Sequence, residues 1–190
     1  MNRRTLLQSL AALAAVPLLS GCLPASSGME ASSTTPAAAD ARSRGATPTP
    51  AEVKRLDHPH AYWRDKVSPE AYAVLFDENT EAPFSSPLDK EERAGTFVCA
   101  ACRLPLFDST AKFDSGTGWP SFTVPIAGHT GSKRDFKLVW PRTEYHCARC
   151  GGHQGHVFSD GPAPRGERWC NNGLALAFVP QGQPLPELRG

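Results

Sequence analysis

The chain has 190 residues, of which 20 are Lys or Arg and 19 are Asp or Glu, so its formal net charge is +1. This length suffices for one domain with a hydrophobic core but not for two large domains. Such a balance of charges argues against nucleic acid as the main partner, because nucleic-acid-binding domains are usually basic. We therefore expect a monomer with one folded domain that does not bind nucleic acid.

Residues 1–22 have the pattern of an export signal. Arg3 and Arg4 precede a short apolar stretch that ends in Leu19-Ser20-Gly21-Cys22, which is similar to a bacterial lipobox. The apolar stretch is too short for a permanent membrane-spanning helix. We expect a lipoprotein anchored through a lipidated Cys22. The alternative is an ordinary cleaved signal peptide in which Cys22 has no role.

The paired arginines also resemble a twin-arginine signal, which exports proteins that are already folded. This route would let a four-thiolate zinc site form in the reducing cytoplasm, so we favour it over the general secretory route. The expected location is the periplasmic face of a membrane. The outer membrane is favoured because Leu23, and not aspartate, follows Cys22.

The composition divides the rest of the chain into a tether, a domain and a tail. Residues 23–55 are rich in Ala, Ser, Thr and Pro, which predicts a disordered tether. Aromatic and branched apolar residues are frequent afterwards, so we place the domain at 56–182 and the tail at 183–190. Ser68-Pro69-Glu70 predicts a helix over 69–77, with Ser68 as its N-cap.

After this helix the sequence predicts a mainly β, antiparallel domain with short N-terminal helices. Short runs of strand-forming residues alternate with Gly and Pro. Leu174, Leu176 and Phe178 alternate with smaller residues, which indicates a half-buried strand. The expected strands cover residues 96–99, 136–140, 143–147, 156–158 and 174–179.

Four cysteines form two matched pairs, Cys99-x-x-Cys102 and Cys147-x-x-Cys150, separated by 44 residues. Two such pairs are typical of a four-thiolate zinc site, in which each sulfur lies about 2.3 Å from the metal. The alternative is two disulfides, which an oxidising compartment would favour. Disulfides within a Cys-x-x-Cys motif are strained, so we expect one structural zinc ion.

His153 and His156 follow the second cysteine pair. Neutral imidazoles can position water and transfer a proton near neutral pH. A catalytic zinc site is the weaker alternative, because no carboxylate pattern completes it. One of the two histidines could instead be a hydrogen-bonded core residue. His58, His60 and His129 carry no functional signal, and His146 is interpreted as a strand residue.

Cys170 is the remaining cysteine, and its neighbours suggest a nucleophile. A free thiol titrates near about 8.5, and only the thiolate attacks. On a strand, Arg168 and Asn172 would share the face of Cys170, where Arg168 could lower its pKa and Asn172 could donate a hydrogen bond. Without these neighbours, an inert buried cysteine would be the usual interpretation.

Trp119 lies in a glycine-rich segment, between Gly118 and Pro120. An aromatic wall would suit a methyl thioether, because sulfur and methyl groups pack well on ring surfaces. The alternative is a tryptophan of the hydrophobic core.

Five collinear motifs of the chain are Phe113-Asp114-Ser115-Gly116, Gly118-Trp119-Pro120-Ser121-Phe122, Cys147-x-x-Cys150-Gly151, Gly155-His156-Val157-Phe158-x-Asp160-Gly161-Pro162 and Arg168-x-Cys170-x-Asn172. Together they resemble the methionine-R-sulfoxide reductase B family, over about residues 62–179. The resemblance implies two antiparallel β-sheets flanked by short helices, with a four-cysteine zinc site. It also implies that Cys170 is the nucleophile and that Trp119, with Phe122, contacts the substrate. The implied polar shell consists of His153, His156, Asp160, Arg168 and Asn172.

The implied reaction is attack of Cys170 on the sulfoxide sulfur of oxidised proteins, which yields methionine and a sulfenic acid. His156 would supply the proton, and Arg168 would hold Cys170 charged beforehand. Thr117 occupies a position where many family members have a second, resolving cysteine. We therefore expect reduction by an external thioredoxin-like thiol. A tethered zinc-ribbon-like interaction module, with Cys170 inert, is the alternative function.

Overall fold

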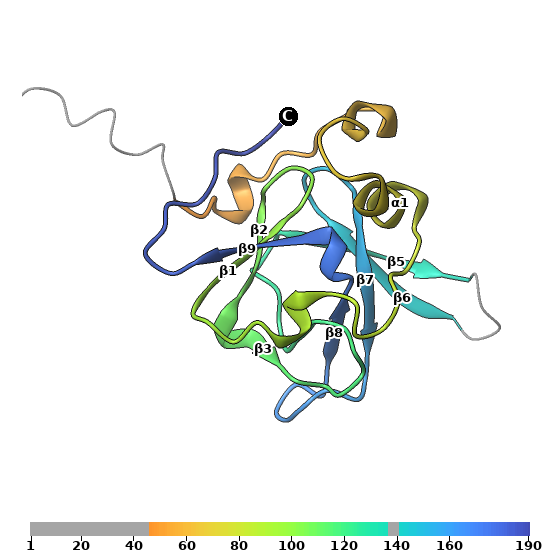
Figure 1. The fold of residues 1–190 in the computed structure, drawn as a ribbon, viewed down its shortest axis with the longest axis vertical. Helices are drawn as coiled ribbons and strands as arrows, with labels where there is room; N and C mark the ends of the chain where they lie inside the picture. The colour runs from red at the N-terminus through yellow and green to blue at the C-terminus, as the bar shows by residue number, and fades with distance from the viewer. Residues whose placement is uncertain (1–45, 137–140) are drawn as a thin grey trace, which may run out of the picture. The chain divides into compact units, whose positions relative to one another are not determined.

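The computed structural model, which describes residues 46–136 and 141–190, is built around two antiparallel sheets. The smaller sheet has the strand order β2-β1-β9, and the larger has the order β3-β4-β8-β7-β6-β5 (Figure 1). This confirms the expected fold class. The strands are β1 Gly95–Cys99, β2 Pro105–Asp108, β3 Lys112–Phe113, β4 Ser121–Phe122, β5 Thr130–Asp135, β6 Arg142–Cys147, β7 His153–Phe158, β8 Arg168–Asn171 and β9 Leu176–Pro180.

Short helices precede the sheets, as expected. The α-helix α1 covers Pro69–Asp77, which are the predicted bounds. Ser68 caps it, because its hydroxyl accepts a hydrogen bond from the Ala71 amide at 3.2 Å. The described 3-10 helices are η1 Pro50–Glu52, η2 His60–Trp63, η3 Pro87–Lys90, η4 Ser109–Ala111 and η5 Gly173–Ala175.

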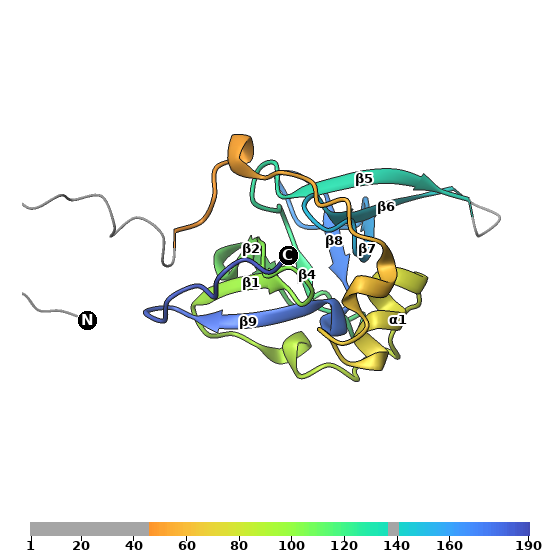
Figure 2. The same cartoon turned by 90° about the horizontal axis from the view of Figure 1, so that it is seen from above.

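The hydrophobic core contains aromatic side chains from both sheets. Phe97 of β1 and Phe107 of β2 contact Phe122 of β4, with ring centroids 5.0 and 4.0 Å away. Tyr145 of β6 joins this group from the larger sheet, 6.1 Å from Phe107. Figure 2 shows the two sheets as separate layers, with α1 at one end. Each layer therefore presents its apolar face to the other.

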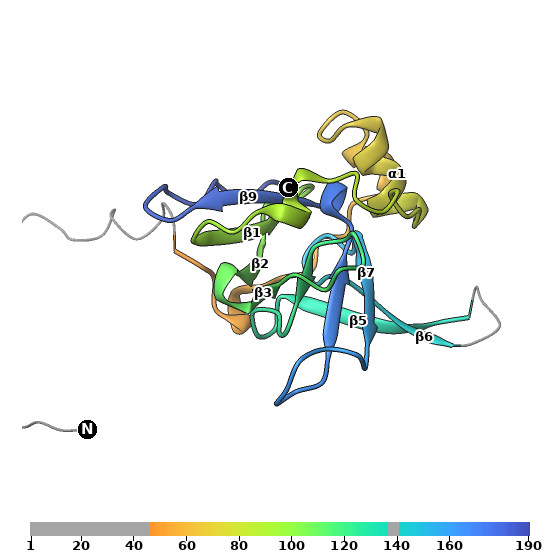
Figure 3. The ribbon, with the colours of Figure 1, turned by 60° about the horizontal axis from the view of Figure 1, so that its bottom comes forward.

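Two strand predictions were wrong in their bounds. The polar segment Thr130–Asp135 forms β5, paired with β6, whereas the predicted strand began at Phe136. Phe136 follows β5, and residues 137–140 lie outside the described residues. Figure 3 shows the β5–β6 hairpin extending away from the smaller sheet. Leu174 lies in η5 and is exposed, so the half-buried strand begins at Leu176.

The predicted tether and tail both include residues that pack against the domain. Val53 contacts the core, and the carbonyl oxygen of Pro48 lies 2.8 Å from Nε2 of the buried His129. At the other end, the Arg189 amide donates to the Cys102 carbonyl at 3.0 Å. The folded unit therefore extends beyond the predicted range of 56–182.

The predicted signal and the first part of the tether, residues 1–45, lie outside the described residues. In the two described ranges, no helix is both long enough and apolar enough to cross a membrane.

Candidate active site and four-cysteine cluster

Cys170 lies on β8 and faces a small cavity. Strand β8 lies between β4 and β7, so Cys170 is directly opposite Ser121 on one side and His156 on the other. The cavity has a volume of about 130 Å³. We call it the Cys170 cavity; it is lined by Thr80, Trp119, Arg142, Gly155, His156, Phe158, Cys170, Asn171 and Asn172. The structure thus brings the predicted nucleophile, aromatic wall and proton carrier together.

Gly155 allows β7 to approach β8 at this point. A Cβ atom on Gly155 would lie 1.9 Å from the Cys170 carbonyl oxygen. No side chain could therefore occupy this position without displacing β8. The close pairing keeps His156, the next residue on β7, beside Cys170.

Trp119 forms one wall of the cavity and is anchored at both its backbone and its indole. The preceding Gly118 has a φ of +89° and accepts a hydrogen bond from the Phe84 amide at 2.7 Å. The indole Nε1 of Trp119 donates to the Glu81 carbonyl oxygen at 3.2 Å. Trp119 is therefore a cavity residue, in agreement with the prediction.

Phe122, only three residues further on, does not line the cavity. It is fully buried and stacks on Phe107 in the hydrophobic core. The expectation that Phe122 contacts substrate was wrong, because β4 turns this side chain toward the smaller sheet.

Arg168 is held in place beside Cys170. Its guanidinium donates two hydrogen bonds to the Asp160 carboxylate, at 2.8 and 3.0 Å, and lies 4.4 Å from the centre of the Phe158 ring. Asp160 thus orients the Arg168 side chain and does not itself line the cavity. This paired geometry fixes the orientation of the cation.

The pKa of Cys170 reflects two opposing effects. Burial raises the pKa of the thiol, whereas the charge and hydrogen bonding of Arg168 lower it; the net direction is upward. Arg168 lowers the pKa of Cys170 as expected, but burial raises this pKa by more. Burial of the thiol therefore opposes the preformed thiolate that we expected, even beside Arg168.

His156 belongs to a hydrogen-bonded chain that ends in an arginine. Its Nε2 lies 2.8 Å from Oδ2 of Asp135, and Arg142 donates to the same oxygen at 2.7 Å. Burial lowers the pKa of His156, although the hydrogen bond to Asp135 opposes this. Burial therefore favours the neutral imidazole, which can accept a proton from the thiol opposite it.

His153 lies behind this chain, outside the Cys170 cavity. It is 3% exposed, and its Nδ1 lies 2.7 Å from Oε1 of Glu144. Burial opposes ionisation of Glu144, but hydrogen bonds from His146 and His153 outweigh it and hold the pKa of this carboxyl at about 2. The ring of His153 is 5.4 Å from that of His156. His153 therefore lies next to His156 but does not line the Cys170 cavity.

Asn172 does not hydrogen-bond to Cys170, contrary to our expectation. Its side-chain nitrogen Nδ2 donates to the Gln154 carbonyl oxygen at 3.0 Å, and its Oδ1 accepts from the backbone amide of Glu81 at 3.1 Å. It follows the last residue of β8, where the chain leaves the sheet. Asn172 thus lines the cavity while holding neighbouring segments together.

Sequence reasoning missed several residues in and around the two cavities and the Trp119 wall: Glu81, Asp135, Arg142, Glu144, Thr80, Phe158 and Asn171. The alternation in Arg142-Thr143-Glu144 was a usable signal, because charged residues two apart on a strand share one face. Asp135 and Glu144 are 8% and 2% exposed, and such burial marks carboxylates with specific partners.

A second, more polar cavity of about 420 Å³ adjoins the first. It shares Thr80, Arg142 and His156 with the Cys170 cavity. Its other lining residues are Glu78, Lys133, Arg134, Asp135, Phe136, Glu144 and His153. The second cavity therefore lies beside the His156 edge of the Cys170 cavity.

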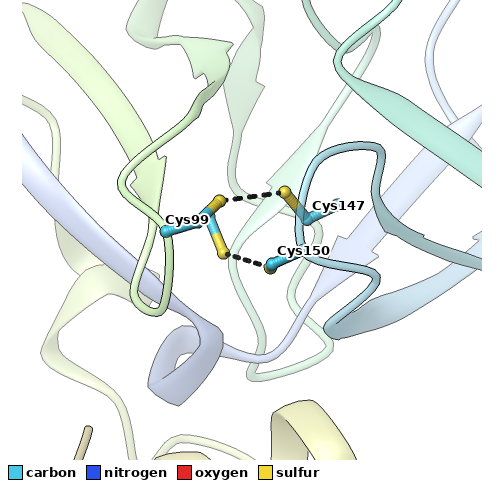
Figure 4. Close-up of side chains that lie close together, drawn as sticks. Cys99, Cys147 and Cys150 are labelled. Atoms are coloured by element: carbon cyan, nitrogen blue, oxygen red, sulfur yellow. Dashed lines mark hydrogen bonds between the residues drawn. The ribbon is translucent and has the colours of Figure 1, made fainter. Parts of the chain in front are cut away.

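The four paired cysteines form a buried cluster. Sγ of Cys99 lies 3.6 Å from that of Cys150, and Sγ of Cys102 lies 3.4 Å from that of Cys147. All four sulfurs lie within 4.8 Å of one another, and none forms a disulfide. Figure 4 shows Cys99 facing Cys147 and Cys150 from the opposite loop. A tetrahedral zinc ion about 2.3 Å from each sulfur requires sulfur separations of roughly 3.8 Å, so the cluster fits such an ion.

Gln154 links this cluster to the Cys170 cavity. Its side-chain nitrogen donates to Cys99 Sγ at 3.6 Å, and its backbone oxygen accepts from Asn172. Within the described ranges, the cluster is the only group of three or more possible ligands close enough to hold a metal. A catalytic zinc site at His153 and His156 therefore has no support.

The SelR domain matches residues 67–180 of the chain. The chain belongs to the SelR family. The matched SelR segment contains the four paired cysteines, Trp119, His156 and Cys170.

Several named relatives share most of this SelR segment. A protein of Bradyrhizobium diazoefficiens is 52% identical over 120 residues, which are 63% of this chain and 86% of the relative. A protein of Pseudomonas putida is 46% identical over 130 residues, covering 68% of this chain and 98% of the relative. A protein of Caulobacter vibrioides is 46% identical over 141 residues, covering 74% of this chain and 84% of the relative. Each relative is named peptide methionine sulfoxide reductase MsrB.

Proposed function

We propose that this SelR protein is a peptide-methionine (R)-S-oxide reductase that acts on methionine-R-sulfoxide in oxidised proteins. The observation that carries the proposal is the Cys170 cavity, in which a thiol, a neutral imidazole and an indole wall share one small space. The relatives named peptide methionine sulfoxide reductase support the same activity.

The first step is attack of Cys170 Sγ on the sulfoxide sulfur. His156 accepts the thiol proton and passes it to the sulfoxide oxygen. The resulting hydroxyl group moves from the methionine sulfur to Sγ, as the S–O bond and the transient bond between the two sulfurs break. The methionine sulfur is reduced by two electrons and the Cys170 sulfur is oxidised by two, giving a thioether and a sulfenic acid. The thiol proton is the only proton required. Arg168 stabilises the negative charge that develops on Cys170 during this transfer.

The substrate side chain binds between aromatic rings and polar groups. Trp119 and Phe158 line the cavity and suit the methyl group and sulfur of the sulfoxide. Asp135 holds the ring of His156, so the proton carrier keeps its orientation toward Cys170. The polar cavity next to it accommodates the polypeptide on one side of the oxidised methionine.

The sulfenic acid is reduced by an external thioredoxin-like dithiol. Thr117 is 2.8 Å from the Ser115 hydroxyl and supplies no thiol, and the other four described cysteines belong to the buried cluster. The first external thiol displaces water and forms a mixed disulfide with Cys170. The second thiol attacks that disulfide and releases Cys170, so the partner leaves as a disulfide.

The four-cysteine cluster holds one structural zinc ion. Bound zinc would cross-link the β1–β2 loop to the β6–β7 loop, and it takes no part in the reaction. Gln154 would act as a partner of the Cys99 thiolate and so connect the metal site to the β7–β8 pair.

The sequence of residues 1–22 supports an exported lipoprotein, anchored through Cys22 on the periplasmic face of a membrane, with the outer membrane favoured. The protein would work there as a monomer on oxidised exported proteins.

The activity is tested with a peptide that contains each epimer of methionine sulfoxide, with a dithiol as reductant. We expect methionine to form from the R epimer and not from the S epimer. Equal turnover of both epimers, or of neither, would contradict the proposal.

A further inference from the structure

We propose that Glu81 is a positioning residue, whose carboxylate and backbone together set the distance between the Trp119 wall and the turn that follows Cys170. This inference rests on the proposed function, because both elements shape the Cys170 cavity. Glu81 lies between α1 and η3, and it is far in sequence from both Trp119 and the turn after Cys170.

Four hydrogen bonds connect Glu81 to the two sides of the cavity. On the Trp119 side, its carbonyl oxygen accepts from the indole Nε1 at 3.2 Å. On the other side, its amide donates to Asn172 Oδ1 at 3.1 Å, and its carboxylate oxygens accept from the amides of Gly173 and Leu174 at 2.5 and 2.9 Å. A single residue therefore fixes the indole and the end of β8 relative to each other.

The shape of the turn requires a carboxylate at this position. Gly173 and Leu174 present two consecutive amides, and a carboxylate is the side chain that offers two acceptor oxygens. A Cβ on Gly173 would lie 1.9 Å from Ser86 Oγ, so the turn packs tightly over Glu81 and Ser86. Glu81 is 8% exposed, and water cannot readily replace these bonds.

Glu81 also acts on Cys170 electrostatically. The negative charge of Glu81 raises the pKa of the Cys170 thiol. The other charged or titratable groups that face Cys170 are Arg168, Asp160, Tyr145, His156 and Arg142. A residue that only held the turn in place would not change the pKa of Cys170. This pKa therefore gives a readout that is separate from KM.

The test compares the full-length wild type with Glu81→Gln, which keeps the shape but removes the charge, and Glu81→Asp, which keeps the charge but shortens the side chain. Glu70→Gln on the exposed first turn of α1 is the matched control. Two quantities are measured: kcat and KM for a methionine-R-sulfoxide peptide, and the pH profile of Cys170 alkylation followed by peptide mass spectrometry. Thermal unfolding establishes that each variant is folded.

We expect Glu81→Gln to lower kcat/KM by about 10-fold or more, mainly through KM, because a hydrogen bond to a charged acceptor is lost. Its alkylation profile should move to lower pH. Glu81→Asp should raise KM while its profile stays close to that of the wild type. Glu70→Gln should match the wild type in both measurements.

A folded Glu81→Gln with unchanged KM and an unchanged alkylation profile would overturn the inference. If the wild type reduced no sulfoxide, the proposed function would fail, while the alkylation profiles would still test the effect of Glu81 on Cys170.

Discussion

Cys170 and His156 lie directly opposite each other on the adjacent antiparallel strands β8 and β7. Directly opposed residues in such a pair have Cβ atoms about 4.5–5.5 Å apart on the same face of the sheet. Behind His156, Asp135 and Arg142 continue the hydrogen-bonded chain. The sheet therefore places the proton acceptor of the proposed reaction beside the thiol.

This arrangement predicts a bell-shaped dependence of kcat/KM on pH. The active form has one proton shared between Cys170 and His156. Because burial lowers the pKa of His156, the acid limb, on which His156 becomes charged, should lie at lower pH than for an unperturbed histidine. Because burial raises the pKa of Cys170, the alkaline limb, on which no proton remains for the sulfoxide oxygen, should lie at higher pH than for an unperturbed thiol.

Asp135→Asn sharpens this prediction. The hydrogen bond that His156 donates to Asp135 raises the pKa of His156, so its loss should move the acid limb to lower pH and leave the alkaline limb in place. An alkaline limb that moved with this substitution, or a flat profile, would show that His156 and Cys170 do not share the proton.

Replacement of Arg168 should weaken the nucleophile. In Arg168→Gln, we expect the pKa of Cys170 to rise and kcat/KM at pH 7 to fall by about 10- to 100-fold, since a hydrogen bond to a charged group contributes about 1.5–3 kcal/mol. The measurement is the pH profile of Cys170 alkylation together with steady-state kinetics. Arg165→Gln, whose side chain is 56% exposed, is the matched control. Equal effects of the two substitutions would mean that Arg168 has no specific role.

Phe122 should behave as a core residue. Phe122→Ala should lower the free energy of unfolding by about 3–5 kcal/mol, because the substitution leaves a cavity among the stacked rings. Denaturant unfolding measures this loss. Phe136→Ala, at a residue that is 69% exposed, should have little effect on stability. If Phe122→Ala had normal stability but a raised KM, Phe122 would be a substrate-binding residue.

The four-cysteine cluster should hold one zinc ion per chain. Cys147→Ser should lose the metal and several kcal/mol of folding free energy, since structural zinc contributes about 10–16 kcal/mol in small domains. Metal analysis and thermal unfolding check both effects. His153→Gln should retain zinc. Retention of zinc by Cys147→Ser and its loss from His153→Gln would assign the metal to the histidines instead.

Local sequence signals predicted those features that depend on a few neighbouring residues. The bounds of α1 followed from Ser68 and Pro69, because capping is decided within one turn. The cysteine cluster followed from its spacing. Strand β5 could not be predicted in this way, because Thr130–Asp135 is a polar segment that becomes a strand through pairing with β6.

The same reasoning explains the errors within the site. The direction of the Phe122 side chain depends on how β4 pairs with β8, and this pairing is a long-range contact. The net pKa of Cys170 depends on burial by residues from several strands, whereas the sequence showed only its neighbour Arg168. Glu81 contacts residues more than 90 positions away, and nothing in its own segment indicates them.

The central claim is that the Cys170 sulfur receives the sulfoxide oxygen. It is tested most directly by a single turnover without reductant, in which a sulfenic-acid trap is located by peptide mass spectrometry and methionine is counted. We expect one trapped Cys170 for each methionine formed, and no methionine from Cys170→Ser. Methionine formation by Cys170→Ser, or rapid formation of an intramolecular disulfide in the wild type, would contradict it.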